Sequence, residues 1–220
     1  MFLSVFDMFK IGVGPSSSHT IGPMVAAARF LEHLRELPFD VAGVRARLHG
    51  SLAFTGVGHA TDRAVILGLS GMEVESYDAE KAEAELNRIS DEKTVAPEGL
   101  PTLRFNPKED VVFDYGPALP GHANGLICQG LDAQGDVITE VTYYSVGGGF
   151  VLTAQELAEG RDSDTGPAVP FPFASADEML RMASKSSKSI AEMKRANELS
   201  RMPGADLDKG LVRIWEVMND

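Results

Sequence analysis

The fold class follows from residues 41–49, which read VAGVRARLH. Between Val44 and Leu48 apolar residues alternate with arginines, and this period of two is typical of a strand with one buried face. Residues 50–58 form a loop by their glycine content, and residues 59–69 then carry apolar side chains at helical spacing. This succession of strand, loop and helix indicates a β-sheet with helices packed on it.

The same patterns predict further elements on both sides of that stretch. Residues 4–10 could form a short helical turn, and helices are expected at residues 20–37 and 79–93. Strand-like runs occur at residues 102–105, 111–115, 124–132 and 136–146, of which the last two are expected to pair as a hairpin. The predicted fold class is therefore α+β, with a mixed β-sheet and helices packed on it.

The composition changes after about residue 150. Residues 161–172 hold three prolines, which is typical of a linker. Helical patterns follow at residues 175–184, 188–199 and 206–218. The sequence therefore predicts an α+β domain at residues 1–150, a linker at residues 151–174 and a helical C-terminal segment at residues 175–220.

Composition limits the partners that this protein can have. The 220 residues are 44% hydrophobic and 24% charged, as is ordinary for a soluble globular protein, and the net charge of −12 argues against a nucleic-acid partner. No stretch approaches about 18 consecutive apolar residues, so no membrane span is expected. The N-terminus lacks the basic start of a secretory signal, and a single cysteine, Cys128, fits a reducing compartment, so we expect a cytoplasmic protein.

The first candidate site is a run of small polar residues before a predicted helix, consisting of Ser16, Ser17, Ser18, His19 and Thr20. Hydroxyl groups and unpaired backbone N–H groups at a helix N-terminus favour a carboxylate or a phosphate as ligand. His19 adds a proton carrier or a cation. A serine at a helix start is usually only an N-cap, but five hydroxyl or imidazole groups in succession favour a binding site.

The second candidate site lies in residues 50–62, where three glycines precede His59 and Asp62. Glycine allows the backbone to approach a ligand closely. His59 falls at a loop-to-helix junction, where its pKa can be tuned for acid–base work, and Asp62 could orient the imidazole ring. The alternative is a capping loop with a structural histidine.

Two further glycine-containing stretches follow. His122 precedes the turn signal Asn124-Gly125, and these residues form either the rim of a site or an ordinary turn. Residues 143–150 carry a glycine triplet after a strand, which suits a turn with positive φ or a backbone wall for a small ligand. Three histidines, a hydroxyl-rich helix start and two glycine loops together favour a small, polar, anionic ligand.

The remaining histidines and the cysteine are expected to be structural. His33 lies on a helix among charged residues and is predicted to be solvated, and His49 lies at a strand end. Cys128 lies within an apolar strand, where it is more often a core residue than a nucleophile. A serine hydrolase is not indicated, because the sequence has no Gly-x-Ser-x-Gly motif.

Four motifs in order resemble the bacterial iron–sulfur L-serine dehydratases (L-serine ammonia-lyases) of the single-chain type. They are residues 4–24, residues 50–62, His122-x-Asn124-Gly125 and residues 143–150, and residues 171–190 resemble the junction to the helical domain of that family. The resemblance implies conversion of L-serine to pyruvate and ammonia without pyridoxal phosphate. It also implies a domain similar to the allosteric substrate-binding domain of some phosphoglycerate dehydrogenases.

Members of this family are longer, and their C-terminal α domain carries the cysteines that hold a [4Fe–4S] cluster. We therefore expect this chain to be an N-terminal piece that ends within the first helices of the α domain, holds no cluster itself and is inactive in isolation. The resemblance implies L-serine as substrate, the cluster-bearing α domain as partner and a homodimer. The open iron of the cluster would act as a Lewis acid on the hydroxyl of the substrate.

The resemblance and the chemistry of the motifs together indicate roles for individual residues. The substrate carboxylate is expected to be held by the hydroxyl groups of the helix start, those of Ser16, Ser17, Ser18 and Thr20. His59 is the first choice for the base that removes the Cα proton, and His19 is the second. His122 and Asn124 are expected to line the site near the substrate amine or the departing hydroxide. No metal ligand is expected in this chain.

The alternative function is a non-catalytic amino-acid sensor of the phosphoglycerate dehydrogenase kind. A sensor needs hydroxyl and amide donors but no histidine that transfers a proton, so histidines in three motifs favour the enzyme. A structural domain whose loops only bind a partner subunit is a third and weaker alternative.

Overall fold

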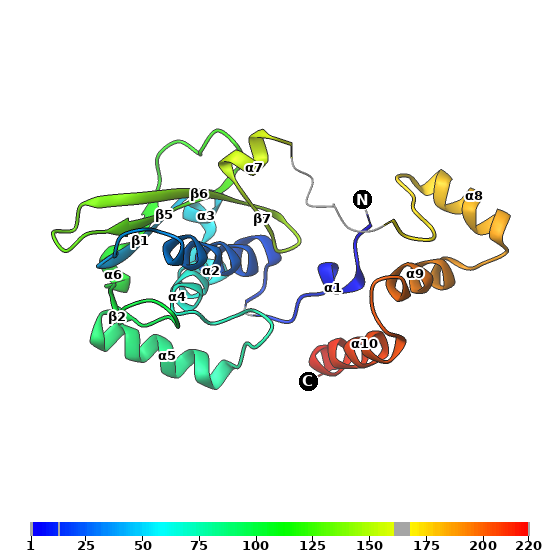
Figure 1. The fold of residues 1–220 in the computed structure, drawn as a ribbon, viewed down its shortest axis with the longest axis horizontal. Coiled ribbons are helices and arrows are strands. Elements are labelled where there is room, and N and C mark those ends of the chain that lie inside the picture. The colour runs from blue at the N-terminus through cyan, green and yellow to red at the C-terminus, as the bar shows by residue number, and fades with distance from the viewer. Residues whose placement is uncertain (1, 13, 161–167, 220) are drawn as a thin grey trace. The chain divides into compact units, whose positions relative to one another are not determined.

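The computed structural model describes residues 2–12, 14–160 and 168–219 (Figure 1). The chain divides into two compact units, one of Gly12–Glu159 and one that combines Met1–Ile11 with Gly160–Asp220. The larger unit holds the sheet, and the smaller one is helical. No helix in the described ranges combines the length and the apolar character needed to cross a membrane.

The larger unit is built on one mixed sheet around strand β1 (Gly43–Gly50). On one side β1 runs antiparallel to β5 (Asn124–Leu131). On the other side it runs parallel to β3 (Leu103–Arg104) and to β4 (Val111–Asp114). The alternation predicted for residues 41–49 is confirmed, because Val44, Ala46 and Leu48 are fully buried.

Antiparallel strands extend the sheet at both edges. β6 (Val137–Gly147) pairs with β5 as the predicted hairpin, β7 (Phe150–Thr153) pairs with β6, and β2 (Thr94–Val95) pairs with β3. The strand order is β2-β3-β1-β5-β6-β7, with β4 beside β1. The predicted α+β class with a mixed sheet is thus confirmed.

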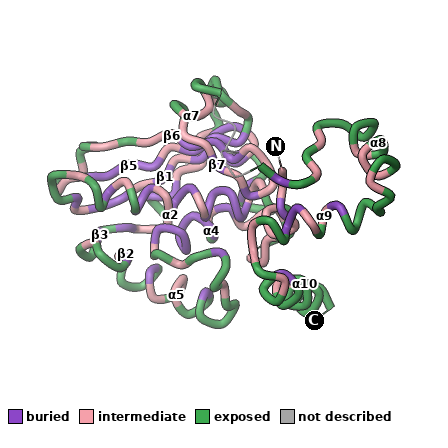
Figure 2. Tube along the Cα trace, turned by 45° about the vertical axis from the view of Figure 1, so that its right-hand side comes forward, coloured by how far each residue is buried: buried purple, intermediate pink, exposed green. Residues whose placement is uncertain are grey.

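Two helices cover one face of this sheet. α2 (Gly22–Arg35) and α4 (Thr61–Leu69) pack on each other, and they lie between the sheet and α5 (Ala79–Glu92) in Figure 1. Buried residues follow the central strands, α2 and α4, whereas α5 is mostly exposed (Figure 2). The main core includes Phe30, Leu31, Leu48, Leu69 and Leu126. Full burial of such a side chain stabilises the fold by about 1.5–3 kcal/mol.

The predicted loop at residues 50–58 is wrong, because most of it is helical. α3 (Ser51–Thr55) starts directly after β1, and a short 3-10 turn at Val57–His59 leads into α4. Gly50 permits the sharp change of direction, because its φ of 55° is a conformation that residues with a side chain rarely adopt. Leu52 is buried in the main core, so tertiary packing stabilises a helix where composition alone indicated a loop.

The glycine triplet at residues 147–149 forms a turn, with φ values of 102°, 61° and 79°. After this turn come β7 and α7 (Ala154–Ala158), whose start carries a capping box of Thr153 and Glu156. The linker predicted at residues 151–174 therefore begins too early, since residues 151–158 belong to the last strand and helix of the larger unit. Residues 161–167 of that linker lie outside the described residues.

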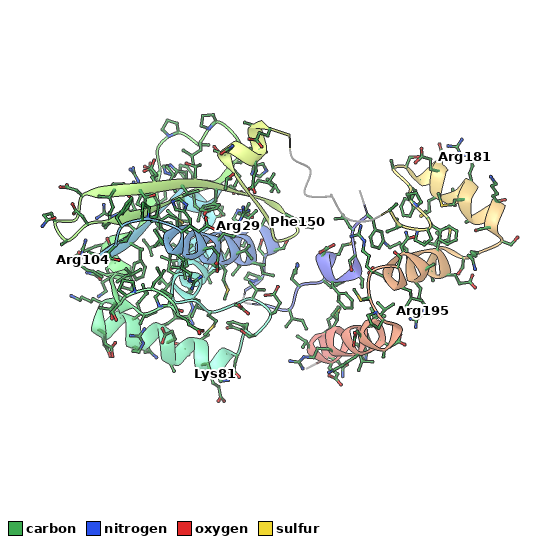
Figure 3. All side chains as sticks on the ribbon, in the orientation of Figure 1. Arg29, Lys81, Arg104, Phe150, Arg181 and Arg195 are labelled. Atoms are coloured by element: carbon green, nitrogen blue, oxygen red, sulfur yellow. The ribbon has the colours of Figure 1, made fainter. Side chains whose placement is uncertain are left out.

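Arg29 of α2, labelled in Figure 3, connects this helix to β7 and α7 within the larger unit. Its guanidinium donates to the Val151 carbonyl oxygen at 2.8 Å and to both carboxylate oxygens of Glu156 at 2.9 and 3.0 Å. It also lies 5.8 Å from the centre of the Tyr143 ring. A forked arginine–carboxylate contact is among the stronger hydrogen-bond geometries in proteins, so these residues belong to the folded unit.

The helical unit contains the short α1 (Val5–Met8), α8 (Ala176–Ser186), α9 (Ile190–Leu199) and α10 (Gly204–Asn219). The N-terminal turn and the three C-terminal helices predicted from the sequence are thus confirmed. The structure also groups residues 1–11 with this helical unit, whereas the prediction placed them in the domain at residues 1–150.

A buried carboxylate joins two parts of the helical unit that are distant in sequence. Glu198 of α9 is 3% exposed and accepts hydrogen bonds from the Ser4 hydroxyl and the Val5 N–H, both at 2.7 Å. On the exposed side of α9, Arg195 pairs with Asp208 of α10 at 2.8 Å (Figure 3). The carboxylate of Glu198 therefore holds the start of α1 against α9.

Candidate active site

The candidate site is organised around the end of strand β1. Gly50, the last residue of β1, is the antiparallel partner of Asn124 at the start of β5. A Cβ at Gly50 would lie 2.4 Å from the Ala123 carbonyl oxygen, so only glycine allows this approach. The next residue, Ser51, donates its N–H to that same oxygen at 2.9 Å. The second and third sequence motifs therefore lie side by side.

The first and second motifs meet through their histidines. The ring centres of His19 and His59 lie 4.8 Å apart, with the ring planes tilted by 35°. The Thr20 hydroxyl donates to the main-chain oxygen of His59 at 2.8 Å, and the Thr61 hydroxyl donates to the main-chain oxygen of His19 at 2.5 Å. The structure thus pairs the two histidines that the sequence analysis singled out as candidate bases.

The ring of His19 lies between two serine hydroxyls. Its Nδ1 is 3.0 Å from the Ser18 Oγ, and its Nε2 is 2.8 Å from the Ser51 Oγ. Burial lowers the pKa of His19, and the neighbouring His59 lowers it further. Both effects disfavour the charged form of the His19 ring.

The ring of His59 is partly exposed, and one backbone contact fixes its orientation. Its Nδ1 lies 2.9 Å from the carbonyl oxygen of Thr55 at the end of α3. A carbonyl oxygen only accepts hydrogen bonds, so Nδ1 carries the proton and Nε2 of the neutral ring carries a lone pair. The partner that orients this ring is therefore the Thr55 carbonyl and not the Asp62 carboxylate, which the sequence had suggested.

The serine run begins the helix earlier than the predicted residue 20. A π-helical turn, η1 (Ser17–Ile21), precedes α2, and Ser16 is its N-cap, with its hydroxyl accepting the His19 N–H at 3.2 Å. Ser17 is exposed and Ser18 is partly exposed, whereas Thr20 is fully buried. The hydroxyls available to a ligand are therefore those of the serines.

Of the two predicted residues in the third motif, Asn124 starts β5 and His122 lies two residues before it. The Asn124 N–H donates to His122 Nδ1 at 3.1 Å, so neutral His122 carries its proton on Nε2. The Asn124 side chain is buried, and its amide nitrogen donates to the Ser145 carbonyl oxygen at 3.2 Å. Asn124 thereby connects the third motif to the fourth.

Three polar residues at this site were missed by the role assignment from sequence, namely Ser51, Thr61 and Ser145. Ser145 is fully buried, its Oγ has no hydrogen-bond partner among the described residues, and a Cβ added to Gly22 would lie 2.0 Å from it. Ser145 therefore packs directly under the start of α2. All three lie inside the quoted motifs, so motif membership was the signal that could have identified them.

The other histidines have structural surroundings. His33, which was predicted to be solvated, is only partly exposed, because its Nε2 lies 2.9 Å from the Thr139 hydroxyl and its ring stacks on Phe30. His49 is buried at the end of β1, as its structural assignment requires. Burial lowers the pKa of His49, although the Asp114 carboxylate, 3.8 Å from its Nδ1, acts in the opposite direction.

Comparison with known proteins identifies the family. A model of the serine dehydratase beta chain family matches residues 4–156. The L-serine dehydratase of Streptomyces coelicolor is 41% identical over 220 residues, covering 99% of this chain and 48% of that protein. An L-serine dehydratase of Helicobacter pylori is 41% identical over 217 residues, which is 98% of this chain and 47% of that protein.

L-serine dehydratase TdcG of Escherichia coli is 38% identical over 222 residues, covering 99% of this chain and 48% of that protein. The chain thus spans about half the length of the curated relatives that it matches. The family model covers most of the chain, including the motifs that meet at the end of β1. The chain therefore belongs to the serine dehydratase beta chain family.

Proposed function

We propose that this chain is the substrate-binding and acid–base part of an L-serine dehydratase, which converts L-serine into pyruvate and ammonia. The observation that carries the proposal is the convergence of His19 and His59, whose rings lie 4.8 Å apart beside a serine-rich helix start. The names of the relatives support L-serine as the substrate. The proposal includes a cytoplasmic homodimer, and the scarcity of cysteine supports the cytoplasmic location.

The substrate carboxylate is assigned to the helix start at Ser17. A helix N-terminus presents unpaired N–H groups to an anion, and the side chains of Ser17 and Ser18 are accessible there. Ser16 contributes as the N-cap that holds this turn. The Thr20 hydroxyl is already bonded to the His59 main-chain oxygen, which leaves the serines as the donors.

His59 is the proposed base for the Cα proton of the substrate. Its Nδ1–H is held by the Thr55 carbonyl oxygen, so its Nε2 lone pair is the proton acceptor. Burial and the neighbouring His59 lower the pKa of His19, which favours an uncharged His19 ring 4.8 Å from the proposed base. His19 is the second candidate for the base.

His122 and Asn124 are assigned to the side of the site near the substrate amine or the departing hydroxide. The hydrogen bond from the Asn124 N–H to Nδ1 leaves the Nε2–H of His122 as a donor. A donor there can hydrogen-bond the oxygen that leaves Cβ. Asn124 can keep this histidine in place because the Asn124 side chain is itself hydrogen-bonded to the Ser145 carbonyl oxygen of β6.

The described residues do not fit an iron–sulfur cluster. Cys128 is buried in β5, where burial raises the pKa of its thiol to about 12 and disfavours the thiolate that binds iron. In the described ranges, no group of three or more His, Cys, Asp or Glu side chains is arranged to hold a metal ion. We therefore assign the cluster that the family resemblance implies to the half of the relatives that this chain does not match.

The proposal is tested by His59→Asn in the complete enzyme, with pyruvate release from L-serine as the measurement. Loss of a general base typically costs about 10²–10⁴ in rate, so kcat should fall by roughly that factor while KM changes little. Lys81→Gln, on the exposed surface of α5, is the control and should leave kcat unchanged (Figure 3).

Other outcomes have distinct meanings. Near-normal kcat in His59→Asn, with activity lost in His19→Asn, would make His19 the base. Retained activity in both variants would mean that the proton goes to a residue outside this chain and that the domain only binds. A complete wild-type enzyme that releases no pyruvate from L-serine would overturn the proposed function.

A further inference from the structure

Two threonines connect the backbone segments that carry the two histidines. Thr20 directly follows His19, and its hydroxyl donates to the main-chain oxygen of His59 at 2.8 Å. Thr61 lies two residues after His59, and its hydroxyl donates to the main-chain oxygen of His19 at 2.5 Å. Each histidine-bearing segment therefore holds the other by one hydrogen bond, and we call these two residues the threonine clamp.

The threonine clamp lies in the interior of the larger unit. Thr20 and Thr61 are both 0% exposed, so water is not available to replace a lost hydroxyl. A buried polar group left without its hydrogen-bond partner destabilises the folded state. Ala60, which separates His59 from Thr61, has a φ of 52°, and such a conformation persists only where neighbouring contacts enforce it. The clamp supplies such contacts on both sides of Ala60.

Helix α3 complements the clamp by orienting the rings. Ser51 at its start contacts His19 Nε2 at 2.8 Å, and Thr55 at its end accepts the hydrogen bond from His59 Nδ1 at 2.9 Å. The Thr55 hydroxyl donates to the Ser51 carbonyl oxygen at 2.8 Å and so joins the two ends of this short helix. The clamp thus holds the two backbones, and α3 holds the two imidazoles.

We infer that Thr20 and Thr61 are positioning residues, which set the two imidazoles in place for proton transfer with the help of Ser51. The inference rests on the proposed role of His59 as the base, and it assigns Thr20 to this task instead of to the substrate carboxylate. Misplacement of a reacting group by about 1 Å can cost roughly 10²-fold in rate. Loss of a positioning residue therefore lowers kcat, whereas loss of a substrate ligand raises KM.

The test replaces each hydroxyl by a methyl group in the complete enzyme. Thr20→Val and Thr61→Val keep the side-chain size, and each is expected to lower kcat for L-serine by about tenfold or more, with KM changed by less than about twofold. Thr20→Ser and Thr61→Ser keep the hydroxyl and should recover most of kcat. Thr139→Val is the matched control, because it removes a hydroxyl that is bonded to another histidine, His33, and should leave kcat unchanged.

Two kinetic outcomes would overturn the inference. A raised KM with unchanged kcat in Thr20→Val would make Thr20 a substrate ligand, and wild-type kcat in both valine variants would show that the clamp has no positioning role. A crystal structure of the double valine variant gives a result that does not depend on activity, because the rings are expected to leave their 4.8 Å spacing. An unchanged spacing would contradict the inference even if the wild-type enzyme failed to act on L-serine.

Discussion

The two compact units differ in how much apolar surface each buries by itself. In the unit of Gly12–Glu159, buried hydrophobic side chains of the sheet, α2 and α4 form a core, and Figure 2 marks the buried positions along these elements. Among the described residues of the helical unit, the buried hydrophobic side chains are Val169, Met193 and Leu207, whereas Trp215 of α10 is 66% exposed. An amphipathic pattern therefore predicts that a helix forms, but it does not predict what covers its apolar face.

The largest expected effect is on the folding of two separate fragments, one that keeps the core of the larger unit and one that holds only the C-terminal helices of the helical unit. A fragment of residues 12–159 should unfold in one cooperative transition, because it keeps its whole core. A fragment of residues 168–219 should show no cooperative transition, because so few buried side chains do not offset the entropy lost on ordering the chain. Thermal melting followed by circular dichroism measures both. A sharp transition in the helical fragment would show that its internal contacts are sufficient for cooperative folding, contrary to this prediction.

Within the larger unit, Gly50→Ala is expected to have the next largest effect. The substitution combines a positive φ with a Cβ close to the Ala123 carbonyl oxygen, so stability should fall by on the order of 3 kcal/mol. Urea unfolding of the complete protein measures the change. Gly58→Ala is the control, since nothing lies within 4 Å of its added Cβ, and it should stay within about 0.5 kcal/mol of wild type. Equal effects of the two substitutions would contradict this explanation.

In the helical unit, a smaller effect is expected from Glu198→Gln. A glutamine amide offers one accepting oxygen where the carboxylate accepts from both the Ser4 hydroxyl and the Val5 N–H, so the contact should weaken by about 1–3 kcal/mol. Hydrogen exchange should become faster in α1 and remain unchanged in β1. Glu192→Gln, at an exposed helix start, keeps a capping box and serves as the control. Unchanged exchange in α1 would mean that other contacts hold this helix.

The smallest expected difference between the two units is in how their stability depends on pH. All five histidines lie within Gly12–Glu159, and burial lowers the pKa of both His19 and His49 below the ordinary value of 6.5. A histidine whose pKa is lower in the folded state binds its proton more readily when unfolded. Its contribution to stability is therefore complete above pH 6.5 and is lost as the pH falls below that value.

This pH dependence separates the two units experimentally. Trp215 is the single tryptophan, so its fluorescence reports on the helical unit, while far-ultraviolet circular dichroism of the fragment of residues 12–159 reports on the sheet. Between pH 7 and pH 5 the stability of that fragment should fall, and His49→Asn should reduce the slope. An unchanged slope in His49→Asn would show that His49 does not contribute.

Local patterns predicted most elements because they depend on neighbouring residues. The strand predicted at residues 41–49 is β1 at Gly43–Gly50, and the predicted helix at residues 79–93 is α5 at Ala79–Glu92. The pattern failed at residues 50–58, because a high glycine content indicates a loop. Burial of Leu52 in the core nevertheless stabilises a helix there. It also missed β7, because four residues are too few for a period of two to stand out.

The sequence by itself determined the α+β class, the family and the motif histidines, because periodicity and motif spacing are local properties of the chain. Only the tertiary structure decided that His19 and His59 form a pair and that Thr20 and Thr61 connect them across the two segments. The physical reason is that hydrogen bonds between distant segments depend on how α2, α3 and α4 pack at the end of β1. That packing also determines which hydroxyls are buried and already bonded, and which remain accessible to a substrate.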